Sequence, residues 1–204
     1  MAITIDGGTN TISGLAVGGL PDGVVDEDML ASNAVSSGKL ASGTGGKILQ
    51  VVSTTKTDVF TSSAGATWTD ITGMTVSITP SATTSKILVL VSANICNAVA
   101  TNPSRIQLLR DSTAIGVGTG SMGSRLPASF ETNLGSGSRT STSGSIIHLD
   151  SPSIPSTPIA ITYKLQGRCA VSGDTFLLNR TGADDDNVYR SRMASSITVQ
   201  EIGA

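Results

Sequence analysis

The stretch Lys86-Ile-Leu-Val-Leu-Val-Ser-Ala-Asn-Ile95 decides the fold class that this sequence predicts. Side chains of a β-strand point alternately to its two faces, so this strand would be apolar on both. One face would carry Ile87, Val89 and Val91, and the other Leu88 and Leu90. A strand of this kind is expected to be central and covered on both sides. We expect an opposing sheet on one side and a subunit interface on the other, formed by Ile87, Val89 and Val91.

Outward from this strand, residues 47–204 predict further short strands separated by Gly, Ser, Thr and Pro turns. In residues 74–79 and again in 159–166, apolar and polar side chains alternate, which is the pattern of a half-buried strand. Eight or nine such strands without βαβ alternation predict an all-β domain over residues 47–204, a jelly-roll-like β-sandwich. The Gly- and Ser-rich residues 116–144 are expected to form a long loop that is functional or ordered by a partner.

Residues 1–46 predict a different kind of structure, because their apolar residues are single and widely spaced. Such a segment cannot bury a core of its own but gains from burial against another surface. Within it, residues 26–35 predict a helix that opens with acidic side chains and is too short to persist alone. We therefore interpret residues 1–46 as an extended arm for anchoring and subunit association. Its anchoring side chains would be Ile3, Ile5, Leu15, Leu20, Val24, Val25, Met29 and Leu30.

The charge composition argues against nucleic acid as a partner. Charged residues make up 14% of the 204, the net charge is −2, and Lys and Arg do not cluster. Phosphate binding needs concentrated positive charge. The first residues lack the basic and continuous apolar segments of a secretory signal, and no apolar stretch is long enough to span a membrane. We expect neither a nucleic-acid nor a membrane partner.

The residues able to carry chemistry form no catalytic pattern. His148 is the single histidine, and no Gly-x-Ser-x-Gly nucleophile motif accompanies it. Cys96 and Cys169 adjoin strand-like segments and are interpreted as buried free thiols, with a disulfide as the alternative. We predict that the chain is not an enzyme and has no catalytic residue, cofactor or metal site.

The acidic run Asp184-Asp-Asp-Asn187 carries oxygen ligands of the kind that a hard cation binds. Calcium binds several oxygen atoms, and this run could supply two or three of them. The spacing of a dedicated calcium loop is absent. We interpret the run as a solvated turn, which could pair with Arg190 or Arg192 across a subunit boundary.

Four stretches of the chain carry a resemblance to a known class of proteins. They are Leu20–Val51, Thr83–Val89, Leu149–Ser153 and Ser195–Ile202. The first resembles the N-terminal linker of structural proteins of tailed bacteriophages, especially phages of cyanobacteria and marine bacteria. The others are similar to the β-domains that follow this linker. The resemblance implies a virion protein with a trimeric jelly roll, assembled in the cytoplasm of the bacterial host.

The resemblance leaves two positions in the virion open. Such domains occur as capsid cement proteins, which clamp the shell on threefold axes, and at the ends of tail fibres, which bind host surface glycans. A chain of this length without a long triple-stranded shaft suits a cement protein better. We therefore predict a homotrimeric capsid cement (decoration) protein on the capsid surface, with the major capsid protein as its partner. The alternative is a tail fibre or other tail appendage whose β-domain binds a host surface glycan.

Overall fold

The computed structural model describes most of the second part of the chain and short segments of the first. Described are residues 47–203 except 100, 121 and 133–140, and, before them, residues 4–6, 8, 11–13, 30, 34 and 35. The chain divides into two units, residues 1–46 and residues 47–204. This division falls at the boundary that the change in composition predicts.

The first unit contains one pair of short antiparallel strands in its described part. They are β1 (Thr4–Asp6) and β2 (Thr11–Ser13), with Ile5 opposite Ile12. The sequence does not predict this pair, because three residues per strand are too few to show an alternation.

Most of the remaining predictions for the arm fall on residues that are not described. The helix predicted for residues 26–35 lies outside the described residues except for Leu30, Ala34 and Val35, none of which is helical. Of the predicted anchoring side chains, Leu30 is described and exposed. Ile5 is described only as part of β1. The others lie outside the described residues: Ile3, Leu15, Leu20, Val24, Val25 and Met29.

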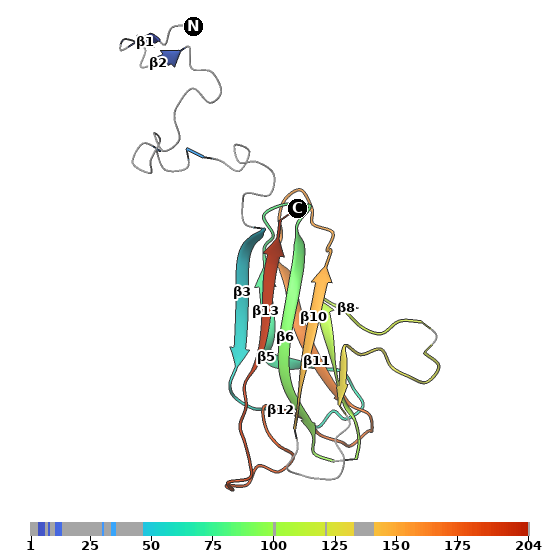
Figure 1. Cartoon of the computed structure of the whole chain (residues 1–204). Coiled ribbons are helices and arrows are strands. Elements are labelled where there is room, and N and C mark those ends of the chain that lie inside the picture. The colour runs from blue at the N-terminus through green and yellow to red at the C-terminus, as the bar shows by residue number, and fades with distance from the viewer. Residues whose placement is uncertain are drawn as a thin grey trace. The chain divides into compact units, whose positions relative to one another are not determined.

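The second unit is a sandwich of two antiparallel sheets (Figure 1). Its strands are β3 (Ile48–Lys56), β4 (Phe60–Ser62), β5 (Thr69–Ile78), β6 (Lys86–Asn97), β7 (Ser104–Arg110), β8 (Thr113–Ile115), β9 (Phe130–Thr132), β10 (Thr142–Asp150), β11 (Ile161–Cys169), β12 (Phe176–Leu178) and β13 (Ser195–Ile202). One sheet, which we call the β6 sheet, has the order β3-β13-β6-β10, and also contains β12 and β4. The other, the β11 sheet, has the order β5-β11-β7-β8, with β9 also paired to β7.

The strand order is that of a jelly roll. β12 and β13 both pair with β6, with Leu178 opposite Ile95 and Ser196 opposite Ser92, so they act as one interrupted strand. In the same way, β3 and β4 together form one interrupted strand, and β8 and β9 together form another. Counted so, the described part of this unit has eight strands. Their order is first, eighth, third, sixth in the β6 sheet and second, seventh, fourth, fifth in the β11 sheet. The predicted jelly-roll β-sandwich is confirmed.

The core lies between the two sheets and corrects one prediction. Ile87, Val89 and Val91 on β6 are 0%, 0% and 4% exposed and belong to this core. The prediction that these three side chains form a subunit interface is wrong, because they pack inside the sandwich of their own chain. The opposite face of β6 carries Leu88 and Leu90, which are partly exposed. The sequence shows that both faces are apolar but does not say which one the second sheet covers.

The stretch 116–144, predicted as one long loop, contains regular structure. β9 pairs with β7 through residues 130–132, and β10 begins at Thr142. Residues 121 and 133–140 lie outside the described part. A three-residue strand carries no periodic signal, so the sequence could not separate it from the loop around it.

A close approach between the two sheets leads to a testable expectation. Gly167 in β11 faces the ring of Phe176 in β12, and a Cβ atom at residue 167 would lie 2.6 Å from that ring. Phe176 is 1% exposed, so its ring cannot turn out of the way into solvent. We expect Gly167→Ala to lower the free energy of unfolding by about 2 kcal/mol through overpacking, as measured by urea unfolding. Gly118→Ala is the control, because a Cβ there makes an ordinary contact at 3.6 Å; equal losses would contradict the overpacking.

Candidate functional site

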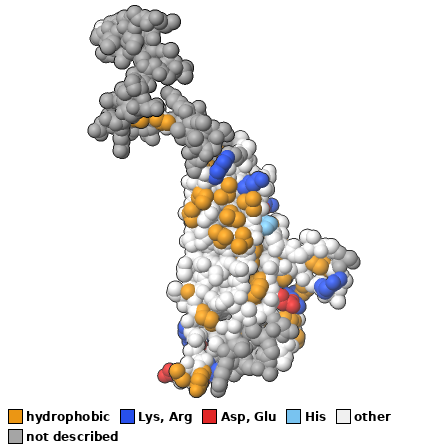
Figure 2. Space-filling model, viewed as in Figure 1, with side chains coloured by type: hydrophobic (Ala, Val, Ile, Leu, Met, Phe, Trp, Pro, Cys, Tyr) orange, Lys and Arg blue, Asp and Glu red, His pale blue; other side chains and the backbone are white. Residues whose placement is uncertain are grey.

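The outer face of the β6 sheet carries a group of exposed apolar side chains. On this face Ile147 is 73%, Val51 55%, Leu149 50% and Leu49 49% exposed. We call these four residues, together with Leu88 and Leu90, the apolar patch. Figure 2 shows the hydrophobic side chains gathered on this face toward the end of the sheet where β3 begins. An antiparallel sheet with one face in water normally alternates apolar and polar residues, so an apolar outer face points to a second cover.

The strand register shows how the patch is built. One row across the sheet reads Val51, Gln200, Leu88, Leu149, and the next reads Ser53, Thr198, Leu90, Ile147. Neither row contains a charged side chain. The third row is entirely hydroxylic: Thr55, Ser196, Ser92, Ser145. Five of the eight side chains in the first two rows are therefore apolar and the other three are uncharged, whereas the third row has only small hydroxyl side chains.

At the other margin of the patch, lysines replace the hydroxyl groups. A shallow depression of about 420 Å³ lies there, lined by Lys47, Thr84, Lys86, Leu149, Ile202 and Gly203. Lys47 precedes β3 and Lys86 begins β6, so both lie at the same end of the sheet. The charged groups thus border the apolar patch and do not interrupt it.

The outer face of the β11 sheet has the opposite character. Lys164 donates to Asp70 at 2.7 Å, and Gln166 donates to the other oxygen of Asp70 at 2.6 Å. The two hydrogen bonds, that of Lys164 first, lower the pKa of Asp70. Gln107 continues the series by donating to Gln166 at 2.6 Å, and the guanidinium of Arg168 lies over the ring of Trp68 at 5.5 Å. This face is polar and bonded to itself, as expected of a surface in water.

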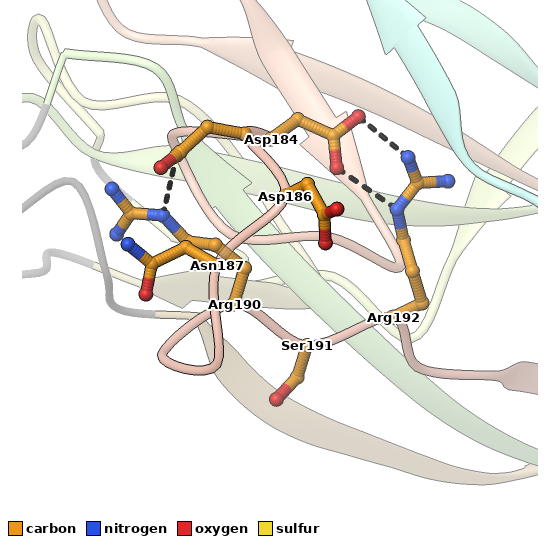
Figure 3. Close-up of a pocket in the computed structure, with 7 residues that line it drawn as sticks. Asp184, Asp186, Asn187, Arg190, Ser191 and Arg192 are labelled. Atoms are coloured by element: carbon orange, nitrogen blue, oxygen red, sulfur yellow. Dashed lines mark hydrogen bonds and ion pairs between the residues drawn. The ribbon is translucent and has the colours of Figure 1, made fainter.

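The acidic run forms an ion-paired loop between β12 and β13 (Figure 3). Asp184 pairs with Arg192 at 2.7 Å and with Arg180 at 3.4 Å, and Asp185 pairs with Arg190 at 2.8 Å. Two of its three aspartates are therefore neutralised by arginines of the same chain, in place of the pairing across a subunit boundary that the sequence suggested. This agrees with the interpretation as a solvated turn. Among the described residues, no group of three or more His, Cys, Asp or Glu side chains could hold a metal ion.

The single histidine is partly exposed on β10, whereas the two cysteines are buried on β6 and β11. His148 lies against Gly116, where a Cβ atom would be 3.3 Å from its ring. Cys96 and Cys169 are both buried thiols that are not joined in a disulfide, as the sequence predicts. Burial raises the pKa of both thiols, that of Cys169 to about 11, so neither is a reactive thiolate near neutral pH.

In comparisons with known proteins, no family model matches this chain and no curated protein sequence matches it. Within the described residues, no helix is long and apolar enough to cross a membrane. The function must therefore follow from the surfaces of the molecule and from the resemblance of its sequence. The apolar patch is a surface whose composition is unusual for a sheet face in water, and it therefore points to a binding partner.

Proposed function

We propose that this chain is a structural protein of a tailed-phage virion, a homotrimeric capsid cement protein that binds the major capsid protein of the assembled shell. The observation that carries the proposal is the apolar patch on one outer face of a jelly roll whose opposite face is polar. Such a subunit is suited to assembly, since its apolar face gains free energy only when another surface covers it. The resemblance of residues 20–51 to phage linkers supports the same placement.

The stabilising mechanism would be thermodynamic. A protein that binds the assembled shell but not its dissociated parts adds its binding free energy to the stability of the shell. Three arms, one from each subunit, act through a high effective concentration, so each can bind weakly while the trimer binds firmly. The arm residues Val24, Val25 and Leu30 are predicted to supply part of this contact.

Particles that lack this chain are the test of the proposal. We expect them to release their DNA at a lower temperature than complete particles, because the shell loses a clamp against internal pressure, while they adsorb to cells at the normal rate. Release can be followed with a DNA-binding dye during heating, and adsorption by counting unbound phage. Adding back the purified protein should restore the release temperature. Normal heat resistance together with failed adsorption would refute a cement role.

A tail fibre is the second candidate, and the loop between β12 and β13 favours it. Val188 and Tyr189 on this loop are 90% and 65% exposed. The loop lies at the end of the sandwich opposite to the start of β3 (Figure 1). An exposed aromatic ring at a far end is suited to contact with a host glycan. If Tyr189→Ala blocks adsorption and leaves DNA release unchanged, the fibre function replaces the cement function.

A further inference from the structure

We propose that the apolar patch is the surface through which copies of this chain contact one another in the trimer. This inference rests on the homotrimer of the proposed function and assigns its interface. The contact residues are then Leu49, Val51, Leu88, Leu90, Ile147 and Leu149 on the outer face of the β6 sheet. They replace Ile87, Val89 and Val91, which the core of each chain already covers.

The patch is large enough for the apolar centre of a subunit interface. Four side chains that are each about half exposed or more present apolar surface on the order of a few hundred Å², the size of the largest patch on a typical monomer, which is often functional. A specific interface buries roughly 800 Å² per partner, with an apolar centre and a polar rim. The apolar side chains of the first two rows would supply the centre. The hydroxyl row Thr55, Ser196, Ser92 and Ser145 would supply the rim.

The distribution of charge favours a second copy as the occupant. The two rows that contain the patch carry no charged side chain, so two copies can face each other there without burying an unpaired ion. Lys47 and Lys86 lie at the margin, where their ammonium groups stay in water at one end of the assembly. In a threefold arrangement with the strands parallel to the axis, each row of one chain would lie at the same height along the axis as the same row of its neighbours. Ile147 of one chain would then lie beside the row of a neighbour that contains Leu90.

The position at which the second unit begins also favours strands that run parallel to the threefold axis. The second unit begins at Lys47, and β3 passes directly from there into the patch through Leu49 and Val51. With strands parallel to the axis, the three copies of Lys47, to which the first unit connects, would lie at one end of the trimer. The three loops that carry Asp184–Arg192 would then lie together at the other end. One end for anchoring and one end facing outward is what a cement trimer requires.

The test measures the mass of the full-length protein in solution by light scattering with size-exclusion chromatography. We expect the wild type to elute at about three times the chain mass of 20.6 kDa. Ile147→Asp and Leu149→Asp should each reduce the mass about threefold, to that of the monomer, because each places a carboxylate in the apolar centre. Their far-ultraviolet circular dichroism should stay that of the wild type, because both side chains are exposed in the single chain. Thr75→Asp is the matched control, since it adds the same charge to the exposed face of the β11 sheet and should leave the trimer intact.

Each other outcome overturns the inference in a recognisable way. If both patch variants stay trimeric, the interface lies elsewhere, while the homotrimer and the cement function stand. If the wild type is a monomer, the second copy is excluded as occupant together with the homotrimer. A monomeric wild type whose melting temperature falls in Ile147→Asp would show that the chain covers the patch itself. A monomeric wild type with unchanged melting, whose patch variants no longer bind particles, would identify the capsid as the occupant.

Discussion

Replacing Asp150 by Ala is expected to lower the free energy of unfolding by about 3 kcal/mol or more. Asp150 is 5% exposed and accepts hydrogen bonds from Arg110 at 2.7 and 3.0 Å and from the hydroxyl of Tyr163 at 2.8 Å. Removing the carboxylate leaves a partly buried guanidinium and a buried hydroxyl without their partner. Breaking a buried ion pair in this way costs about 3–5 kcal/mol. Urea unfolding followed by circular dichroism measures the loss.

The exposed face of the other sheet offers a matched control for this substitution. Asp70 also pairs with one cation, Lys164, but its side chain is 55% exposed. Water replaces the lost partner there, so Asp70→Ala should cost about 1 kcal/mol or less. If the two substitutions lower the free energy of unfolding equally, burial does not decide the strength of these ion pairs. The reason given for the large effect of Asp150→Ala would then be wrong.

The fold could be predicted from sequence because its signals are local. The apolar alternation in residues 74–79 appears in the structure as β5, and the two-faced strand at residues 86–95 appears as β6 at the centre of its sheet. Turns rich in Gly, Ser and Pro separate the strands. A single chain of this size that is nearly free of helical patterns has few ways to bury such strands other than a sandwich.

The candidate interaction surface could be predicted only in part. Apolar residues on both faces of β6 indicate that each face needs a cover. The core of the sandwich covers Ile87, Val89 and Val91, whereas a cover for Leu88 and Leu90 stays a prediction. The choice between the faces depends on which side the β11 sheet packs, and that is a property of the connections between strands. A further signal was present in Ile146-Ile147-His148-Leu149, where Ile147 and Leu149 interrupt the expected polar face of β10.

The buried polar groups could not be predicted, because their partners are distant in sequence. Asp150 is joined to residues 110 and 163 only when β10 lies at the end of one sheet and β7 and β11 in the other. Glu201 is a stronger case, since its carboxylate meets Gln50 and the turn between β5 and β6. No spacing in the chain relates these positions.

Glu201→Gln is expected to lower stability at neutral pH by about 3 kcal/mol and to flatten its dependence on acid. Glu201 is 0% exposed. Its carboxylate accepts hydrogen bonds from the Ser85 hydroxyl, from the Gln50 amide, and from both the hydroxyl and the backbone N–H of Ser81, all at 2.7 Å. Burial raises its pKa, but these hydrogen bonds outweigh burial and lower the pKa from 4.5 to about 2. Such a shift corresponds to about 3 kcal/mol of stability for the ionised form.

The sign of the pH effect follows from the lowered pKa. The unfolded chain takes up the proton near pH 4.5, whereas the folded chain holds Glu201 ionised until about pH 2. The stabilisation is therefore complete above about pH 4.5 and is lost as the pH falls toward 2. Wild-type stability should fall through this interval with a steeper slope than that of Glu201→Gln, as measured by urea unfolding at a series of pH values.

Glu131→Gln is the control, because its side chain is 47% exposed and pairs with Arg105 at the surface, and it should cost about 1 kcal/mol or less. If the stability of wild type and of Glu201→Gln changes in parallel between pH 4.5 and 2, the hydrogen bonds to Glu201 do not favour the ionised carboxylate.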